Sequence, residues 1–443
     1  MYLLYSFTLT VLFALLLPYF LYQALRHGKY ASSFRERLGR LPATLGQDPR
    51  PTVWVHAVSV GEFLAAKPLI AALREEFTDW RIVVSTTTAT GQRLARAEQP
   101  DRFDAVCYFP FDWAFSVRRA LDRIRPSLVV ILETELWPNF LRECRRRGVV
   151  TVVANGRISP RSFARYRRAR GFIRRTMADL SLLVMQSEAD AERARALGAR
   201  EVRVCGNLKY DAPLGGTTSP LNDPQSPVAG ELDRRLALSS ARRLIVAGST
   251  APGEERMLLA ALCEIRREPG LEETRLLIAP RHPERFDEVA EQIGQYDFRT
   301  ARRSALPAGA AEGEAARAEV ILLDSIGELA ALYRFAAVVF VGGSLVPRGG
   351  HNIIEPAAFA RPIVVGPHTE NFKQIVADFA EAGAVVQVVA SGDGMTGALA
   401  RALCRLLKDR EAAQAMGVRA RQILLSNRGA THCTVLAIRE RMR

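Results

Sequence analysis

Short apolar runs of strand length alternate with helical patterns along the chain, and this alternation limits the fold more than any other feature. Two groups of such runs are separated by one break. The first group covers 52–58, 81–86, 128–133, 149–154, 181–186 and 202–205, and the second covers 243–247, 275–280, 319–323, 337–341, 362–365 and 384–389. Short buried strands that alternate with helices form parallel sheets with right-handed crossovers. The sequence therefore predicts an α/β protein with two doubly wound, Rossmann-like domains.

The break at 211–231 is rich in Pro, Gly, Ser and Asp, which is typical of a linker. We expect a linker over 211–240 that joins an N-terminal α/β domain, residues 26–210, to a C-terminal one, residues 241–443. Two such domains would face each other across a cleft. Ligands of open α/β sheets bind at the carboxyl ends of the strands, so residues that directly follow strands are the candidates for function.

The first 25 residues contain no charged side chain, and this length is sufficient for a helix that crosses a bilayer. Tyrosines lie near both ends of the stretch, and the basic residues follow it, unlike the order in a signal peptide. The pattern predicts a single-pass membrane anchor over 1–25, with the rest of the protein in the cytoplasm. The alternative is a helix that lies in the membrane surface, which Pro18 slightly favours.

The net charge of +14 is concentrated in the N-terminal half. Residues 1–215 carry 33 Lys and Arg against 20 Asp and Glu, a net of +13, and the remainder carries 28 against 27, a net of +1. Such an excess indicates an anionic partner: nucleic acid, phospholipid headgroups or an anionic substrate. No recognised nucleic-acid motif accompanies it, so we expect lipid phosphates and no nucleic acid.

The densest basic stretch, 155–180, holds eight arginines interleaved with aromatic residues. Arginine suits the phosphates of headgroups or of a lipid substrate. The alternative is an ordinary solvated helix face. Candidates for contact with the acceptor or the membrane are Arg161, Arg165 and Arg168.

The six cysteines are scattered and form no C-x-x-C pair. This spacing predicts neither a zinc site nor a disulfide framework, and it indicates a reducing compartment. The chain also lacks D-x-D and H-E-x-x-H motifs. We therefore expect a reaction that uses no metal and no cofactor.

Three charged residues of the N-terminal half follow predicted strands. Glu62 stands at the start of a helical pattern in HAVSVGEF, where a carboxylate is either a helix-start residue or a general base on a rigid corner of the sheet. Glu133 is the first acid of ETELWPN, and its alternative is a helix N-terminus. Lys209 lies in GNLKYD, where it is either a solvated turn lysine or a fixed positive charge at the site.

The C-terminal half has the stronger pattern, because three successive predicted strands end in groups that suit a nucleotide. Pro280 and Arg281 follow one strand, 326–328 follow the next, and the third is followed by the glycine-rich turn 342–344 and by Asn352-x-x-Glu355. Glycine-rich turns and helix N-termini bind phosphate, and Arg281 can add a bidentate contact. Neither a P-loop nor G-x-G-x-x-G is present.

The motifs HAVSVGE, ETELWPN, GNLKYD, PRHPERF, GGSLVPRGGHNIIEP and GPHTENFKQI resemble those of the Kdo (3-deoxy-D-manno-octulosonic acid) transferases of lipopolysaccharide assembly. The resemblance extends over essentially the whole chain. It implies a membrane-anchored glycosyltransferase of the GT-B fold at the bacterial inner membrane. The implied donor is CMP-Kdo, and the implied acceptor is a phosphorylated lipid A precursor.

The resemblance also implies roles for residues. Glu62 matches the family's proton acceptor, and Glu133 and Lys209 match its transition-state stabilisers. The segments that contact CMP correspond to Pro280, Arg281, Ile326, Gly327, Glu328, Asn352, Ile353, Ile354 and Glu355. Two rival hypotheses are a GT-B transferase that uses a UDP-sugar and an inactive, membrane-bound nucleotide-binding protein.

Overall fold

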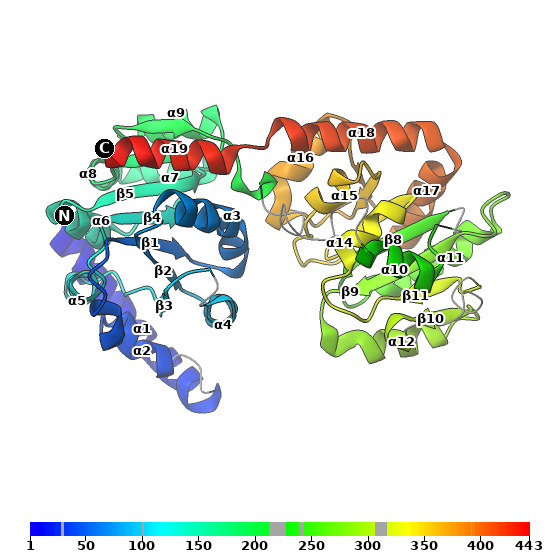
Figure 1. Cartoon of the computed structure of the whole chain (residues 1–443), viewed down its shortest axis with the longest axis horizontal. Helices are drawn as coiled ribbons and strands as arrows, with labels where there is room; N and C mark the ends of the chain where they lie inside the picture. The colour runs from blue at the N-terminus through cyan, green and yellow to red at the C-terminus, as the bar shows by residue number, and fades with distance from the viewer. Residues whose placement is uncertain are drawn as a thin grey trace. The chain divides into compact units, whose positions relative to one another are not determined.

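The computed structural model describes residues 1–27, 31–99, 102–211, 227–239, 243–305, 317–390, 392 and 394–443 (Figure 1). For 19–27, 31–32 and 227–228 it describes the backbone alone. The chain divides into two compact units. Unit 1 comprises Met1–Ala212 and Asn427–Arg443, and unit 2 comprises Pro213–Ser426.

Unit 1 is built on a parallel sheet with the strand order β3-β2-β1-β4-β5-β6-β7. Its strands are β1 (Thr52–Ala57), β2 (Arg81–Thr86), β3 (Ala105–Tyr108), β4 (Leu128–Leu132), β5 (Val150–Gly156), β6 (Leu182–Met185) and β7 (Val202–Val204). Every residue of β1, β2 and β4 is buried, as expected for central parallel strands. The strand order reverses between β1 and β4, which is where open α/β sheets bind ligands.

Helices cover both faces of this sheet (Figure 1). The elements are α1 (Tyr2–His27), α2 (Ala31–Arg37), α3 (Val60–Glu76), α4 (Ala89–Glu98), α5 (Ala114–Ile124), α6 (Pro138–Arg146), α7 (Pro160–Arg168), α8 (Arg170–Ala178), α9 (Glu188–Ala196) and α19 (Ala430–Met442), with 3₁₀ turns η1 (Ala43–Gly46) and η2 (Leu208–Tyr210). One core layer joins the sheet to α3, α4 and α19, and the other joins it to α5, α6, α8 and α9. The sheet is thus buried on both sides, and its carboxyl edge carries the loops.

Unit 2 repeats this architecture with a parallel sheet in the order β10-β11-β9-β8-β12-β13-β14. Its strands are β8 (Leu244–Thr250), β9 (Arg275–Pro280), β10 (Thr300–Arg302), β11 (Val320–Leu322), β12 (Val338–Val341), β13 (Ile363–Val365) and β14 (Val386–Gln387). The order reverses between β8 and β12. The loops after β8, β9 and β12 therefore flank the expected ligand position of this sheet.

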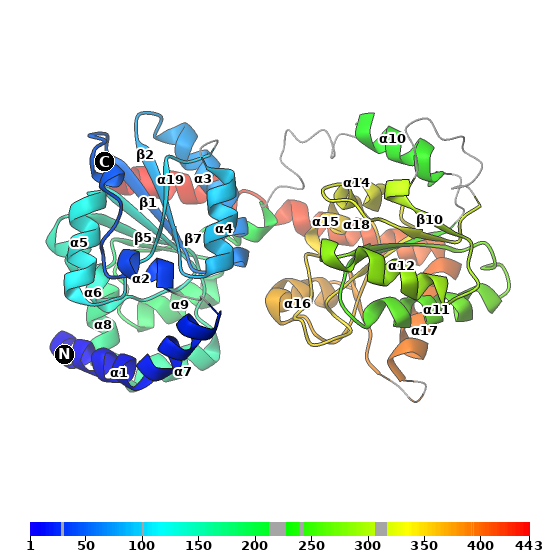
Figure 2. The ribbon, with the colours of Figure 1, turned by 90° about the horizontal axis from the view of Figure 1, so that it is seen from below.

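Helices again flank the sheet of unit 2 (Figure 2). They are α10 (Pro227–Leu236), α11 (Glu254–Arg267), α12 (Phe286–Gly294), α14 (Leu329–Leu332), α15 (Ile354–Ala358), α16 (Lys373–Glu381), α17 (Gly394–Lys408) and α18 (Arg410–Ser426), with η3 (Pro283–Arg285), η4 (Arg303–Ala305), η5 (Tyr333–Phe335) and η6 (Glu370–Phe372). The expected linker lies partly outside the described residues, and α10 begins within its predicted range.

Each predicted apolar run forms a strand, so the prediction of two parallel α/β sheets is confirmed. Two strands, β3 and β10, were not predicted. Both are short: β10 has three residues and reads Thr-Ala-Arg, and β3 is an apolar run of only four residues, Ala-Val-Cys-Tyr. They lie at the edges of the two sheets, where pairing on one side alone is sufficient and side chains need not be buried.

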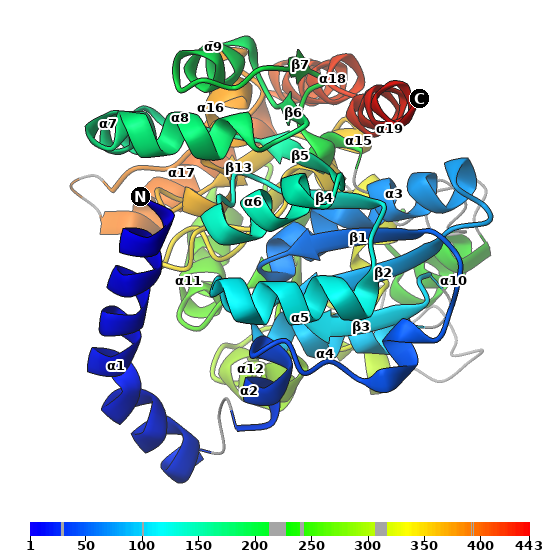
Figure 3. The ribbon, with the colours of Figure 1, turned by 90° about the vertical axis from the view of Figure 1, so that its left-hand side faces the viewer.

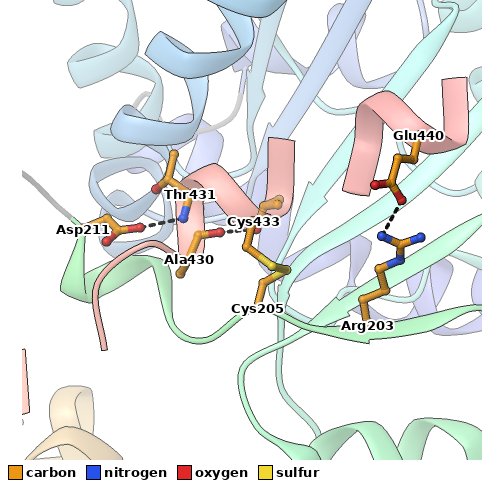
Figure 4. Close-up of a disulfide and its surroundings, with 8 residues drawn as sticks. Arg203, Cys205, Asp211, Ala430, Thr431, Cys433 and Glu440 are labelled. Carbon is orange, nitrogen blue, oxygen red and sulfur yellow. Dashed lines mark hydrogen bonds and ion pairs between the residues drawn. A yellow bond between two sulfur atoms is a disulfide. The ribbon is translucent and has the colours of Figure 1, made fainter. Parts of the chain in front are cut away.

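The C-terminal helix α19 corrects the expected domain boundary, because residues 427–443 belong to unit 1 and not to a domain over 241–443. Its apolar residues Val435 and Ile438 pack in the core layer of α3. The carboxylate of Asp211 accepts the N–H of Thr431 (Figure 4) and that of Gly429 at 2.8 Å, which satisfies donors at the start of the helix. A periodic apolar pattern predicts a helix but not the sheet on which it packs.

A disulfide joins Cys205, after β7, to Cys433 in α19, with Cα atoms 5.5 Å apart (Figure 4). The prediction of no disulfide is therefore wrong for this pair. The two residues are separated by 228 positions and meet because α19 packs on unit 1. Sequence spacing cannot reveal such a pair, since the contact depends on the tertiary fold.

Helix α1 lies along unit 1, running from α8 towards α2 (Figure 3). Its half-buried positions recur with helical spacing, at Tyr2, Tyr5, Ser6, Leu9 and Phe13. Rings of α1 contact Phe172 of α8 and Trp113 before α5. Among the described residues, the structure contains no helix with the length and apolar content needed to cross a bilayer, so the predicted spanning anchor is not found. Some of the α1 side chains that the sequence assigned to lipid pack on unit 1, and the others are exposed.

Candidate active site

Glu62 lies in the first turn of α3, directly after β1. The Ser59 hydroxyl accepts the N–H of Glu62 at 3.4 Å, and the Glu62 carboxylate accepts the N–H of Val58 at 2.6 Å and the hydroxyl of Ser59 at 3.2 Å. These bonds are close to a capping box. The helix-start interpretation of Glu62 therefore describes its local bonding correctly.

Burial gives the same carboxyl group an unusual acidity. It raises the pKa of Glu62 to about 7, the hydrogen bond from Val58 opposes this, and the negative charges of Glu133 and Glu135 raise the pKa further. A carboxyl group with such a pKa is about half ionised at neutral pH, which suits proton transfer. Glu62 thus caps a helix and has the acidity of a general base.

Glu133 follows β4, the neighbour of β1, and has a left-handed backbone with φ 54°. Its N–H donates to Ala154 of β5 at 2.9 Å. A residue other than glycine in this region costs of the order of 1 kcal/mol or more and is often found at functional sites. One carboxylate oxygen of Glu133 lies 4.0 Å from the ammonium nitrogen of Lys209.

The turn that carries Lys209 is held from two sides. The Asn207 side chain accepts the N–H of Lys209 at 3.0 Å, and the side chain of Asn155 accepts the N–H of Leu208 at 3.0 Å. Asn155 also has a left-handed backbone, with φ 59°. Glu62, Glu133 and Lys209 are therefore brought together at the carboxyl edge of one sheet, as predicted.

The predicted donor residues of unit 2 also gather at a carboxyl edge. The N–H of Arg281, after β9, donates to Thr250 at the end of β8 at 3.0 Å, while its guanidinium is exposed. The Asn352 side chain donates to Glu355 at 3.2 Å and accepts the N–H of Ile354 at 3.0 Å. Burial raises the pKa of Glu355, and the Asn352 bond and the charge of Arg281 oppose this. Arg281 and Glu355 are thus close enough to act on one ligand.

Ile353 and Ile354 differ from the other predicted donor residues, because both side chains are buried in the core. Only their backbone can reach a ligand. Glu328 is paired with Arg303 at 2.8 Å, and its neighbour Ile326 is 80% exposed. The segment 326–328 therefore offers a ligand an apolar side chain and the backbone of Gly327, which has φ 89°.

The glycine-rich turn 342–344 is already occupied by a carboxylate of the chain itself. Glu254, at the start of α11, is completely buried and accepts the N–H groups of Ala251, Gly343, Ser344 and Leu345 at 2.7 to 2.9 Å. The interpretation of this turn as a phosphate site is therefore wrong. The only sequence signal was an acid at a helix start, and such a residue does not reveal which N–H groups it binds.

The basic stretch forms α7 and α8, and Arg161, Arg165 and Arg168 are exposed on α7. Its aromatic residues point the other way: Phe163 and Tyr166 pack against the core of unit 1. Phe172 of α8 contacts α1 at both Tyr2 and Tyr5, with ring centroids 5.6 Å apart in each pair. The arginines therefore form an exposed basic face beside α1.

Comparisons with known proteins agree with these features. The family model described as 3-deoxy-D-manno-octulosonic-acid transferase (kdotransferase) matches residues 32–212. A 3-deoxy-D-manno-octulosonic acid transferase of Haemophilus influenzae is 34% identical over 403 residues, which covers 90% of this chain and 89% of that protein. The transferase of Bordetella pertussis is 33% identical over 413 residues, covering 91% and 90%.

A solved UDP-GlcNAc 2-epimerase of Neisseria meningitidis resembles the whole architecture, with a TM-score of 0.58 over 88% of this chain and 100% of its own, at 13% identity. At this identity the likeness shows the fold alone. Function is better judged from the curated relatives, which share sequence over nearly their whole length. On that evidence, the chain belongs to the 3-deoxy-D-manno-octulosonic acid transferase family.

Proposed function

We propose that the protein transfers Kdo from CMP-Kdo to a sugar hydroxyl of a phosphorylated lipid A precursor in lipopolysaccharide biosynthesis. The observation that carries the proposal is the half-buried Glu62, with a pKa of about 7, in a chain 34% identical to the Haemophilus influenzae transferase. The acceptor hydroxyl must lose its proton as it attacks the anomeric carbon. Glu62 is the general base of this step, because a carboxyl group with this pKa is about half ionised at neutral pH.

Glu133 and Lys209 stabilise the charges that develop during transfer. As the bond to CMP breaks, positive charge develops on the sugar ring, and a carboxylate beside the ring stabilises it. Kdo is a sugar acid, and the ammonium of Lys209 suits its carboxylate. The 4.0 Å distance between the two side chains leaves them close enough to act on neighbouring atoms of one sugar.

The donor nucleotide binds at the carboxyl edge of the unit 2 sheet. The exposed guanidinium of Arg281 holds the phosphate of CMP, and the Asn352 and Glu355 side chains hydrogen bond the ribose hydroxyls. Glu254 already uses the N–H groups of the turn 342–344, so Arg281 is the main source of positive charge for the leaving group in this proposal. The reaction is metal-independent.

The protein attaches to the cytoplasmic face of the inner membrane through α1 and the basic face of α7. Leu3, Phe7 and Leu15 of α1 are 88%, 67% and 73% exposed, on the side away from unit 1. A helix with exposed apolar side chains can lie in the plane of a membrane surface, and neighbouring arginines bind anionic headgroups. The same arginines attract the phosphates of the acceptor.

The test is to incubate the protein with lipid A precursor and either CMP-Kdo or a UDP-sugar, and to measure the nucleotide released. We expect acceptor-dependent release of CMP, unchanged by EDTA. Release of UDP would favour the rival transferase, and binding of CMP without transfer would favour an inactive nucleotide-binding protein. Loss of activity in EDTA would refute the metal-independent mechanism.

A further inference from the structure

Unit 1 contains an apolar pocket of about 170 Å³ between α1 and the carboxyl edge of the sheet. Two of its walls are α1 and the aromatic loop that follows β3, and a third wall follows β4. Its apolar side chains include Leu9, Phe13, Phe109, Phe111, Trp113 and Trp137, and Arg37, Thr87 and Asp112 also line it. A cavity of about 150 Å³ with apolar walls binds benzene, so this pocket has room for roughly six carbon atoms.

The α1 wall of the pocket is fixed by polar contacts on both sides of Leu9. Ser6 accepts the side-chain N–H of Asn139 at 3.0 Å, and Thr10 accepts the indole N–H of Trp113 at 3.1 Å. The Phe13 ring lies 4.9 Å from that of Trp113, in edge-to-face contact. The pocket is therefore part of the folded unit and not a chance gap beside a detached helix.

Two walls of the pocket are continuous with the candidate catalytic residues. Thr87 lines the pocket, and its N–H donates at 3.2 Å to Val58, whose own N–H donates to Glu62. Trp137 lies in the same loop as Glu133, after β4. A ligand in the pocket would therefore extend from the region of the proposed base.

Trp137 adds a polar requirement to this apolar site. Its indole nitrogen is buried and has no hydrogen-bond partner among the described residues. A buried donor without a partner is unfavourable, so a ligand that brings an acceptor would be favoured. An acyl chain attached through an ester or amide has one carbonyl oxygen at its start and only methylenes beyond it.

We propose that this pocket binds the first part of one acyl chain of the acceptor, with the carbonyl on Trp137 and about six carbons among the rings. The inference rests on the proposed function, because it assumes a lipid acceptor. The opposite side of α1 exposes Phe7 and Val11, so a chain that leaves the pocket would meet an apolar, membrane-facing helix. The enzyme would thus recognise acylation itself in addition to the sugar.

The test compares two variants of α1 with two acceptors in the same mixed micelles. Leu9→Trp fills the pocket, and Leu4→Trp makes the same change on the exposed side as a matched control. The acceptors are the acylated phosphorylated disaccharide and the same disaccharide after removal of its chains. Each buried methylene contributes roughly a factor of four, so Leu9→Trp, which displaces about six carbons, should lower kcat/KM for the acylated acceptor on the order of 10³-fold.

Leu9→Trp should leave kcat/KM for the deacylated acceptor and the affinity for CMP-Kdo unchanged, and Leu4→Trp should behave like the wild type. Trp137→Phe keeps an aromatic ring but removes the N–H donor, and it should lower kcat/KM about tenfold for the acylated acceptor alone. If Leu9→Trp does not fold, this second variant tests whether the pocket binds the acyl chain. Equal effects of Leu9→Trp on both acceptors, or equal behaviour of the two α1 variants, would overturn the pocket assignment. Absence of Kdo transfer by the wild type to either acceptor would instead refute the proposed function.

Discussion

Replacing Glu62 with Gln tests the general base, because Gln resembles the protonated carboxyl group and can still accept the N–H of Val58. A pKa of about 7 against the ordinary 4.5 means that the folded protein disfavours the ionised form. Protonated Glu62 makes its full contribution to the stability of the folded protein below pH 4.5, and this contribution is lost as the pH rises through about 7. The difference corresponds to at most about 3 kcal/mol.

The variant should therefore be as stable as the wild type at pH 4.5 and more stable by about 1–3 kcal/mol at pH 8, measured by urea unfolding at both values. Its rate of Kdo transfer should fall by about 10²–10⁴. The wild-type rate should rise with pH through about 7, and the variant should lose this rise. A Glu62→Gln protein that is less stable at pH 8, with near-normal turnover, would show that Glu62 only caps α3 and would refute the reasoning.

Three further predictions concern the rest of the molecule. Arg281→Ala and Glu355→Gln should each weaken CMP-Kdo binding in calorimetry while acceptor binding is preserved; the reverse pattern would place the donor elsewhere. Glu254→Ala leaves four buried N–H groups without a partner, so thermal unfolding should show a loss of at least about 3 kcal/mol; an unchanged melting temperature would contradict this role. Changing three arginines of α7 to Gln should weaken binding to anionic vesicles about 10²-fold in low salt, and less in high salt, at roughly 1 kcal/mol each; binding that is unaffected at every salt concentration would show that they are only a solvated face. The three are Arg161, Arg165 and Arg168.

The sequence predicted the sheets well because parallel strands are buried on both faces and therefore read as continuous apolar runs. For the same reason it placed Glu62 and Glu133 at one edge, since each follows such a strand, whereas Lys209 follows the exposed edge strand β7. Strand β10 was not predicted, because three residues at a sheet edge need no apolar pattern.

Contacts between distant segments explain the other differences. Cys205 and Cys433 meet only because α19 returns to unit 1, and the target of Glu254 is a turn about 90 residues away. The apolar content of α1 indicated a lipid environment, but its spacing at Tyr2, Tyr5, Leu9 and Phe13 also fits packing on a protein surface. Composition cannot distinguish these two uses of an apolar face.

The central claim is that this chain adds Kdo to a lipid A precursor with Glu62 as the base. Mass spectrometry of the lipid product, formed from CMP-Kdo by the wild type and by Glu62→Gln in parallel, tests both parts at once. The account predicts that the wild type adds the mass of Kdo to the precursor, and that the folded variant adds it at a rate at least about 10² lower. A wild-type product without added Kdo, or equal product from both proteins, would contradict the account.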